Sequence, residues 1–154
     1  MTTHKLDDQD YAILRLLQQD ASQPQREIAE KVHLSAPAVQ RRIARLEKLG
    51  VIQRTVAIID PGAVGFPVTV IVNVVLRDDR STTVAQAKAF YRNAPEVQQC
   101  YWAAGLGLIM ILTLPSTEAY EDQTARLFGD NDLVTSYSTV VVLDRVKFGT
   151  SIPF

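Results

Sequence analysis

The chain has 154 residues, of which 47% are apolar, and its 16 basic and 17 acidic side chains give a formal net charge of −1. This length and apolar fraction fit one ordinary domain or two small ones with buried cores, and they exclude disordered and collagen-like architectures. The single cysteine, Cys100, excludes an internal disulfide framework and a zinc site built from several cysteines. We expect a folded protein without a metal ion or a cofactor.

The beginning of the chain and its hydropathy favour a cytoplasmic protein with no membrane partner. The sequence becomes acidic at Asp7 and Asp8, where a signal peptide would become apolar. No uninterrupted apolar stretch approaches the roughly 18 residues that a membrane-spanning helix requires.

The charge is unevenly distributed along the chain. Residues 1–60 hold 9 basic and 8 acidic side chains, whereas residues 61–154 hold 7 and 9. Within residues 35–54, five basic side chains accompany one acidic side chain, Glu47. The near-neutral total therefore hides a basic segment, and it does not exclude a nucleic acid as partner.

The first fifty residues have helical periodicity. Asp7 suits the N-cap of a first helix, and the helix dipole favours Asp10 in its first turn. Pro24 suits the first position of a second helix, and a short break follows at His33 and Leu34. The apolar stripe of the first helix consists of Ile13, Leu14 and Leu17. That of the second helix consists of Ile28, Ala29 and Val32.

A third, basic helix is predicted from Ser35, its N-cap, to Gly50, which suits a left-handed C-cap. On a helical projection Val39, Ile43 and Leu46 form a narrow apolar seam, and the cationic side chains point away from it. Three helices with a tight turn before a basic helix predict a helix-turn-helix. The alternative is that the basic side chains form an ordinary solvated helix face.

The second half predicts an α+β domain with the order βαββαβ, the order of a ferredoxin-like sandwich with both helices on one side of the sheet. The even positions of the first strand are wholly apolar, whereas its odd positions include Thr69, Asn73 and Arg77. The predicted strands cover residues 68–76, 97–103, 108–114 and 134–143, and the predicted helices begin near Thr82 and Ser116.

The open face of this sheet would expose more apolar area than a monomer usually leaves in water. Pairing of two copies through that face is the natural solution, and a two-fold dimer matches palindromic DNA. We therefore predict a homodimer.

Three segments resemble the Lrp/AsnC (feast/famine) family of transcriptional regulators. They are the run from Leu6 to Leu14 (LDDQDYAIL), the run from Glu27 to Ser35 (EIAEKVHLS) and the run from Val39 to Ile52 (VQRRIARLEKLGVI). The resemblance covers essentially the whole chain and implies a winged helix-turn-helix followed by a RAM-type effector-binding and assembly domain. We divide the chain into residues 1–50, a linker strand or wing and turn at 51–67, and residues 68–154. The resemblance implies that residues 51–59 pair with the same strand of the dimer mate. It further implies dimers, which in this family often assemble into octamers, and control by an amino acid or related metabolite.

The resemblance places the effector site at the turn that joins the second and third strands of the carboxyl-terminal domain. That turn often carries an aspartate in the family, but residues 103–108 contain no carboxylate, so a zwitterion loses an obvious partner for its ammonium group. The glycines of this turn are equally explained as a tight turn with positive φ. The candidate effector residues are Ala104, Gly105, Leu106, Gly107, Ser136 and Thr139.

We predict a DNA-binding regulator that is not an enzyme. No cluster of acids, bases or nucleophiles suggests catalysis, although ferredoxin-like folds host many enzymes. A ligand-independent architectural DNA-binding protein is an alternative. An RNA-binding sheet is another, although the third strand lacks the aromatic residues on which RNA bases stack. The candidate DNA contacts are Ser35, Ala38, Gln40, Arg41, Arg42 and Arg45.

Overall fold

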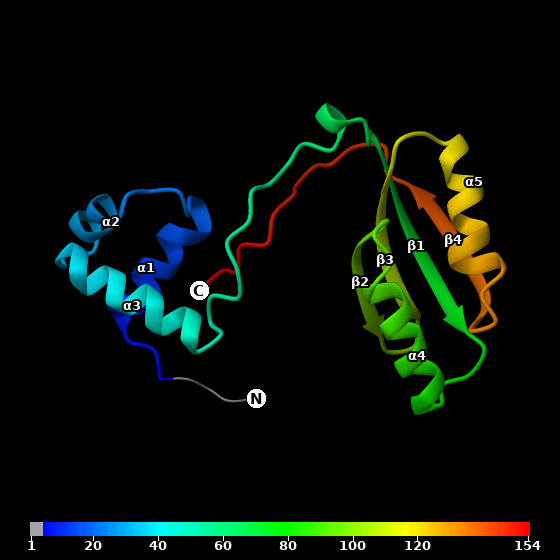
Figure 1. Cartoon of the computed structure of the whole chain (residues 1–154), viewed down its shortest axis with the longest axis horizontal. Coiled ribbons are helices and arrows are strands. Elements are labelled where there is room, and N and C mark those ends of the chain that lie inside the picture. Colours follow the sequence, from blue (N-terminus) through cyan, green and yellow to red (C-terminus); the bar gives the residue numbers. More distant parts are fainter. Residues whose placement is uncertain (1–4) are drawn as a thin grey trace. The chain divides into compact units, whose positions relative to one another are not determined.

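The computed structural model describes residues 5–154, which form two compact units (Figure 1). The first comprises residues 5–58 and 147–154, and the second comprises residues 59–146. The sequence-based division placed residues 147–154 in the second domain, whereas their contacts group them with the first unit. No described helix is long and apolar enough to span a membrane.

Helix α1 (Asp8–Gln19) begins at the predicted N-cap, and its first turn is closed by two aspartates. The Asp10 amide donates to Oδ1 of Asp7 at 2.9 Å, and the Asp7 amide donates to Oδ2 of Asp10 at 3.1 Å. This reciprocal capping box satisfies two amides that have no partner inside the helix. It also fixes the Asp10 side chain on the face of α1 that carries the buried Ile13.

Helices α2 (Gln25–Lys31) and α3 (Ala36–Lys48) follow as predicted, with a small shift at the start of α2. Pro24 is the N-cap rather than the first helical residue, because its ψ of 137° is extended. The turn between the helices contains His33 in the left-handed conformation. Ser35 caps α3 by accepting from the amide of Ala38, and Gly50 follows its end at a φ of +71°.

The carboxyl-terminal segment packs on α1. The Gln18 side chain donates to the carbonyl of Ile152 at 3.2 Å and accepts from the Ile152 amide at 2.7 Å. The rings of Tyr11 and Phe154 lie 5.7 Å apart, and Arg15 donates to the carbonyl of Phe154 at 2.8 Å. These contacts explain why residues 147–154 belong to the first unit. No local sequence pattern predicted these contacts, because the partner residues are more than a hundred positions apart in the chain.

The second unit confirms the predicted order βαββαβ. Its strands form one antiparallel sheet in the order β2-β3-β1-β4. The elements are β1 (Val68–Leu76), α4 (Ser81–Arg92), β2 (Val97–Ala103), β3 (Gly107–Leu114), α5 (Glu118–Thr124) and β4 (Val134–Val141), with the 3₁₀ turn η1 (Gly62–Val64) before β1 and the π-helical turn η2 (Ala125–Gly129) after α5. Residues 51–59, for which the resemblance implies a strand that pairs with the dimer mate, form no strand within the single described chain.

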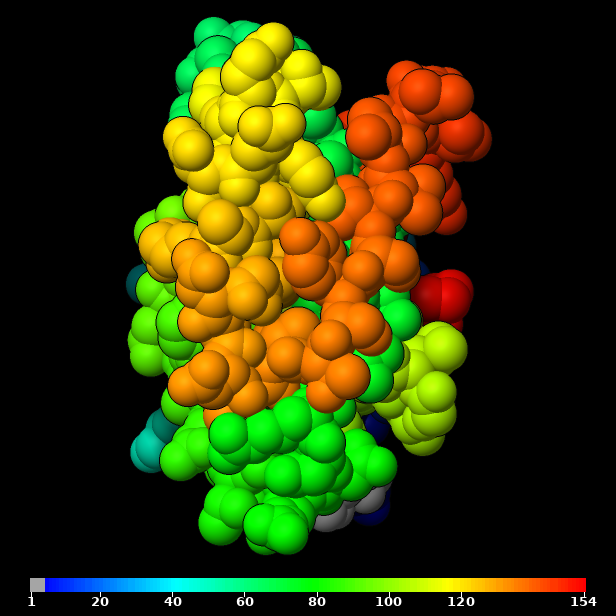
Figure 2. Space-filling model, turned by 90° about the vertical axis from the view of Figure 1, so that its right-hand side faces the viewer, coloured from blue at the N-terminus to red at the C-terminus, as the bar shows by residue number. Residues whose placement is uncertain are grey.

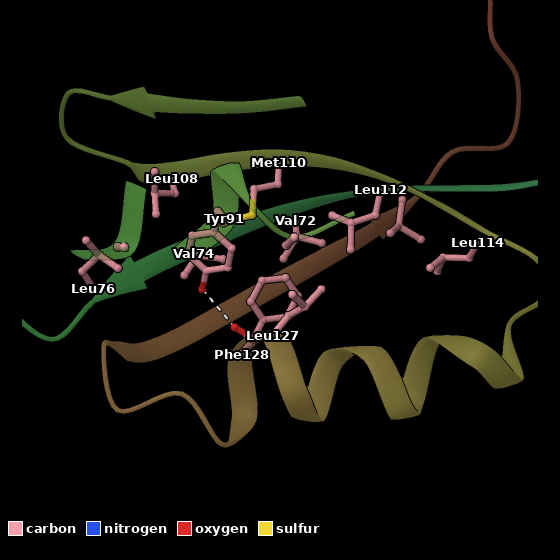
Figure 3. Close-up of a cluster of buried hydrophobic side chains, with 13 residues drawn as sticks. Val72, Val74, Leu76, Tyr91, Leu108, Met110, Leu112, Leu114, Leu127 and Phe128 are labelled. Carbon is pink, nitrogen blue, oxygen red and sulfur yellow. Dashed lines mark hydrogen bonds between the residues drawn. The ribbon is translucent and has the colours of Figure 1, made fainter. Parts of the chain in front are cut away.

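One face of the sheet forms the core with both helices (Figure 3). The even positions of β1 and β3 are buried there, except for the half-buried Val68 at the start of β1, as the alternation along β1 predicts. Tyr91 from α4 and Phe128 from η2 pack over them with ring centroids 6.1 Å apart. The Tyr91 hydroxyl donates to the carbonyl of Leu127 at 3.0 Å, so the polar end of this buried ring is satisfied.

Gly107 brings the start of β3 close to the end of β1. It has a φ of +87°, and a Cβ at this position would lie 2.3 Å from the carbonyl oxygen of Val74. Gly105, in the same turn, also has positive φ but open space around it. Gly107 therefore meets a steric requirement that Gly105 does not, and it holds the β2–β3 turn against the end of β1.

Candidate nucleic-acid interface and effector pocket

Helix α3 presents most of the predicted DNA contacts on its surface. Val39 and Leu46 are fully buried and attach the helix to its unit. Ser35, Gln40, Arg41 and Arg45 are exposed, and Ala38 and Arg42 are half-buried.

Two of the predicted contacts form ion pairs with helix α1. Nη1 of Arg42 donates to Oδ1 of Asp10 at 2.7 Å and to both carboxylate oxygens of Asp7 at 2.8 Å. Nη2 of Arg45 donates to the other oxygen of Asp10. The helical projection predicted that the cations point away from the core, whereas these two long side chains bend back to a buried carboxylate.

The Asp10 carboxylate is fully buried and ionised. Burial raises the pKa of this group, but the hydrogen bonds from the Asp7 amide, Arg45 and Arg42 together leave the pKa of Asp10 below its ordinary value. Arg42 and Arg45 keep 27% and 45% of their side-chain surface exposed, so both side chains remain partly accessible from solvent. Asp10 thus anchors α3 to α1 through two guanidinium groups.

The β2–β3 turn lines a pocket of about 420 Å³ within the second unit. Gly105, Leu106 and Gly107, three of the predicted effector residues, belong to its wall. The exposed Ala104 does not line it. The other side of the pocket comes from the end of β1 and the residues after it, Val75, Leu76, Arg77, Asp78 and Asp79, which Gly107 brings close to the turn.

The structure places the two predicted β4 residues differently. Ser136 lies opposite Val75 in the β1–β4 register and so stands beside the pocket wall, although it does not line the pocket. Thr139 lies on the helix-covered side, where it accepts a hydrogen bond from the Tyr120 hydroxyl. Thr139 lines a separate hollow of about 230 Å³ between α5 and the sheet, visible in Figure 2 between the yellow helix and the orange strand.

The charged residues of the pocket were missed by sequence reasoning. Asp78 is already bonded: the Thr83 side chain and the Arg80 amide donate to it, and these bonds lower its pKa. Arg77 lies beside it, with Nε 3.7 Å from a carboxylate oxygen of Asp78. Asp79 is exposed and has no hydrogen-bond or ion-pair partner among residues 5–154. The sequence signal that could have identified them is the run of three charged residues, Arg77, Asp78 and Asp79, directly after the buried strand β1.

No group of three His, Cys, Asp or Glu side chains in residues 5–154 could hold a metal ion.

We predict that replacing Asp10 by Asn lowers the free energy of unfolding at neutral pH by about 3 kcal/mol, because two guanidinium groups lose their buried counter-charge. The pKa of Asp10 is lower in the folded chain than in the unfolded chain. Its contribution to stability is therefore complete above the unfolded pKa, near 4, and is lost as the pH falls through the folded pKa.

Denaturant unfolding of wild type and Asp10→Asn across this pH range checks the prediction. The difference in unfolding free energy should be constant above about pH 5 and shrink below about pH 4. A difference that persists unchanged in acid would show that the Asp10 charge does not stabilise the unit.

Comparison with known proteins agrees with this geometry. A family model described as winged helix-turn-helix DNA-binding matches residues 6–53, and one described as the Lrp/AsnC ligand binding domain matches residues 69–152. The HTH-type transcriptional regulator y4tD of Sinorhizobium fredii is 41% identical over 150 residues, which cover 97% of this chain and 89% of the relative.

Solved structures share the fold over nearly the whole chain. An AsnC family transcriptional regulator from Agrobacterium tumefaciens superposes with a TM-score of 0.89 at 29% identity, covering 96% of this chain and 97% of that one. A transcriptional regulator of Neisseria meningitidis, solved as a complex with L-methionine, gives a TM-score of 0.85 at 25% identity, covering 97% of both chains. The chain belongs to the Lrp/AsnC family of helix-turn-helix transcriptional regulators, with an amino-terminal DNA-binding domain and a carboxyl-terminal ligand-binding domain.

Proposed function

We propose that this regulator binds double-stranded DNA as a dimer, with helix α3 of each protomer in the major groove, and that an amino acid bound at the β2–β3 turn controls it. The observation that carries the proposal is the exposed basic face of α3, held on a frame of two helices. The proposed contacts are Ser35, Ala38, Gln40, Arg41, Arg42 and Arg45.

Within this set, Gln40 and Arg41 are the most available for a duplex. Both are exposed, and Arg41 has no ion-pair partner among the described residues. A glutamine or arginine side chain in the major groove hydrogen-bonds base edges, and an arginine also binds phosphate. Ser35 and the amides of the first turn of α3 suit a phosphate, because a helix N-terminus carries partial positive charge.

Replacing Arg41 by Ala should weaken DNA binding and flatten its salt dependence. Each lost phosphate contact lowers the slope of log K against log salt by about 0.9. The measurement is fluorescence anisotropy on a duplex selected from a random library with the wild-type protein, between about 50 and 200 mM salt.

The matched control is Arg92→Ala, which removes the same charge from the last residue of α4 and should leave affinity and slope unchanged. Equal slopes for Arg41→Ala and Arg92→Ala would contradict the placement of α3 on DNA.

The dimer is proposed through the open face of the sheet. Ile71, Val75 and Val140 are 39%, 43% and 64% exposed on that face, far more apolar surface than a monomer usually leaves in water.

Replacing Ile71 by Glu should convert the dimer to a monomer, because a charge would be buried at the interface. Multi-angle light scattering after size exclusion measures the mass and also distinguishes a dimer from an octamer. Ala89→Glu places the same charge on the exposed side of α4 and should keep the wild-type mass. A monomeric wild type, or an Ile71→Glu variant of unchanged mass, would refute this interface.

The pocket at the β2–β3 turn fits a free amino acid. Arg77 can take the ligand carboxylate, and the unpaired Asp79 can take the ammonium group in place of the acid that the turn lacks. Val75 and Leu106 supply apolar contact for a side chain. The L-methionine complex of the Neisseria relative supports this ligand class.

Replacing Asp79 by Asn should weaken the binding of the best amino acid by about tenfold or more, the loss expected for one charge-assisted hydrogen bond. Affinity for the corresponding keto acid, which has no ammonium group, should not change. Thermal-shift screening identifies the ligand and calorimetry measures its affinity. The control Asp122→Asn removes an equal charge from α5 and should bind as wild type does. Failure of every amino acid to bind the wild type would favour a ligand-independent regulator.

A further inference from the structure

Arg42 and Arg45 are among the proposed DNA contacts, but the buried carboxylate of Asp10 that pairs with both of them has no role in the proposal so far. One fully buried carboxylate accepts from two arginines of the recognition helix, one on each of its oxygens. The capping box fixes its position, since Oδ2 of Asp10 also accepts from the Asp7 amide. The carboxylate therefore cannot swing away with the arginines.

This arrangement determines what the two arginines can do on DNA. A mobile arginine on a helix surface binds any nearby phosphate and raises affinity for all sequences. A guanidinium group held by a carboxylate has part of its charge neutralised and its remaining N–H groups fixed in direction. Such a group gains little binding free energy from a phosphate at an arbitrary position. A base acceptor at one defined position, in contrast, meets donors that are already oriented toward it.

The exposures of the two arginines fit this distinction. Arg42 is 27% exposed and its Nη1 is shared between two carboxylates, so it is the more tightly held. Arg45 is 45% exposed and pairs through one nitrogen, which leaves most of its donors available. Arg41, between them in sequence, is exposed and unpaired in the described chain.

We propose that Asp10 is a specificity-determining positioning residue: by holding Arg42 and Arg45 it suppresses their binding to phosphates of any sequence and orients them toward the bases of the preferred site. This inference rests on the proposed placement of α3 in the major groove. A purely structural Asp10 would stabilise the fold without changing the ratio between specific and non-specific affinity.

Asp10→Asn tests the proposal, because asparagine keeps the size of the side chain and removes its charge. Asp8→Asn is the matched control: Asp8 lies in the same first turn, loses the same charge and is exposed. Both variants and the wild type are titrated with a duplex selected by the wild type and with a scrambled duplex, across a salt series. Circular dichroism at the working temperature confirms that each variant is folded.

Relative to Asp8→Asn, the Asp10→Asn variant should bind the scrambled duplex about tenfold more tightly near 0.1 M salt, with a slope steeper by about 0.9 for each new phosphate contact. Its affinity for the selected duplex should not rise, so the ratio of the two affinities should fall by about tenfold or more. If ratio and slope equal those of Asp8→Asn, the proposal is overturned.

A second pair of variants tests the same idea with Asp10 intact. Arg42→Gln should weaken binding to the selected duplex and leave the salt slope on the scrambled duplex unchanged, whereas Arg41→Gln should lower that slope. Equal loss of slope in both variants would show that Arg42 is a free phosphate contact and would overturn the proposal. A wild type that selects no sequence at all would refute the DNA-binding proposal itself, and this inference with it.

Discussion

One buried carboxylate joins α3 to α1 in addition to the apolar contacts of α3. Helix α3 has two fully buried side chains, Val39 and Leu46, and most of its surface is polar. Asp10 adds two charge-assisted hydrogen bonds from α1 to α3 at positions that apolar packing leaves free. The face proposed to bind DNA and the fold therefore share Arg42 and Arg45.

The sequence could predict those parts of the structure that depend on interactions between residues close together in the chain. The N-caps Asp7 and Ser35 bond to amides three residues away, and alternation along β1 needs only its own residues to define a buried face. The order βαββαβ followed from such local signals, and so did the positive φ at Gly50.

What could not be predicted depends on partners distant in the chain. Arg42 and Asp10 are 32 residues apart, and Gln18 and Ile152 are 134 apart, so no spacing rule connects them. The helical projection placed Arg45 on the solvent side because a projection gives only the direction in which a side chain leaves the helix. A long side chain can bend from that direction and reach a neighbouring helix. The charged side of the pocket at the β2–β3 turn was missed for a related reason. Asp79 approaches that turn only when antiparallel pairing sets the end of β1 beside the start of β3.

Strand β1 spans the second unit between its pocket and its connections to the first unit. Its end, at Val75 and Leu76, lines the pocket at the β2–β3 turn. The beginning of β1 follows the linker from the first unit. Next to it, the amide of Val142 donates to the carbonyl of Thr69 at 2.9 Å. Val142 directly follows β4, where the chain continues toward residues 147–154 of the first unit. Both chain connections thus leave the second unit at neighbouring positions of paired strands.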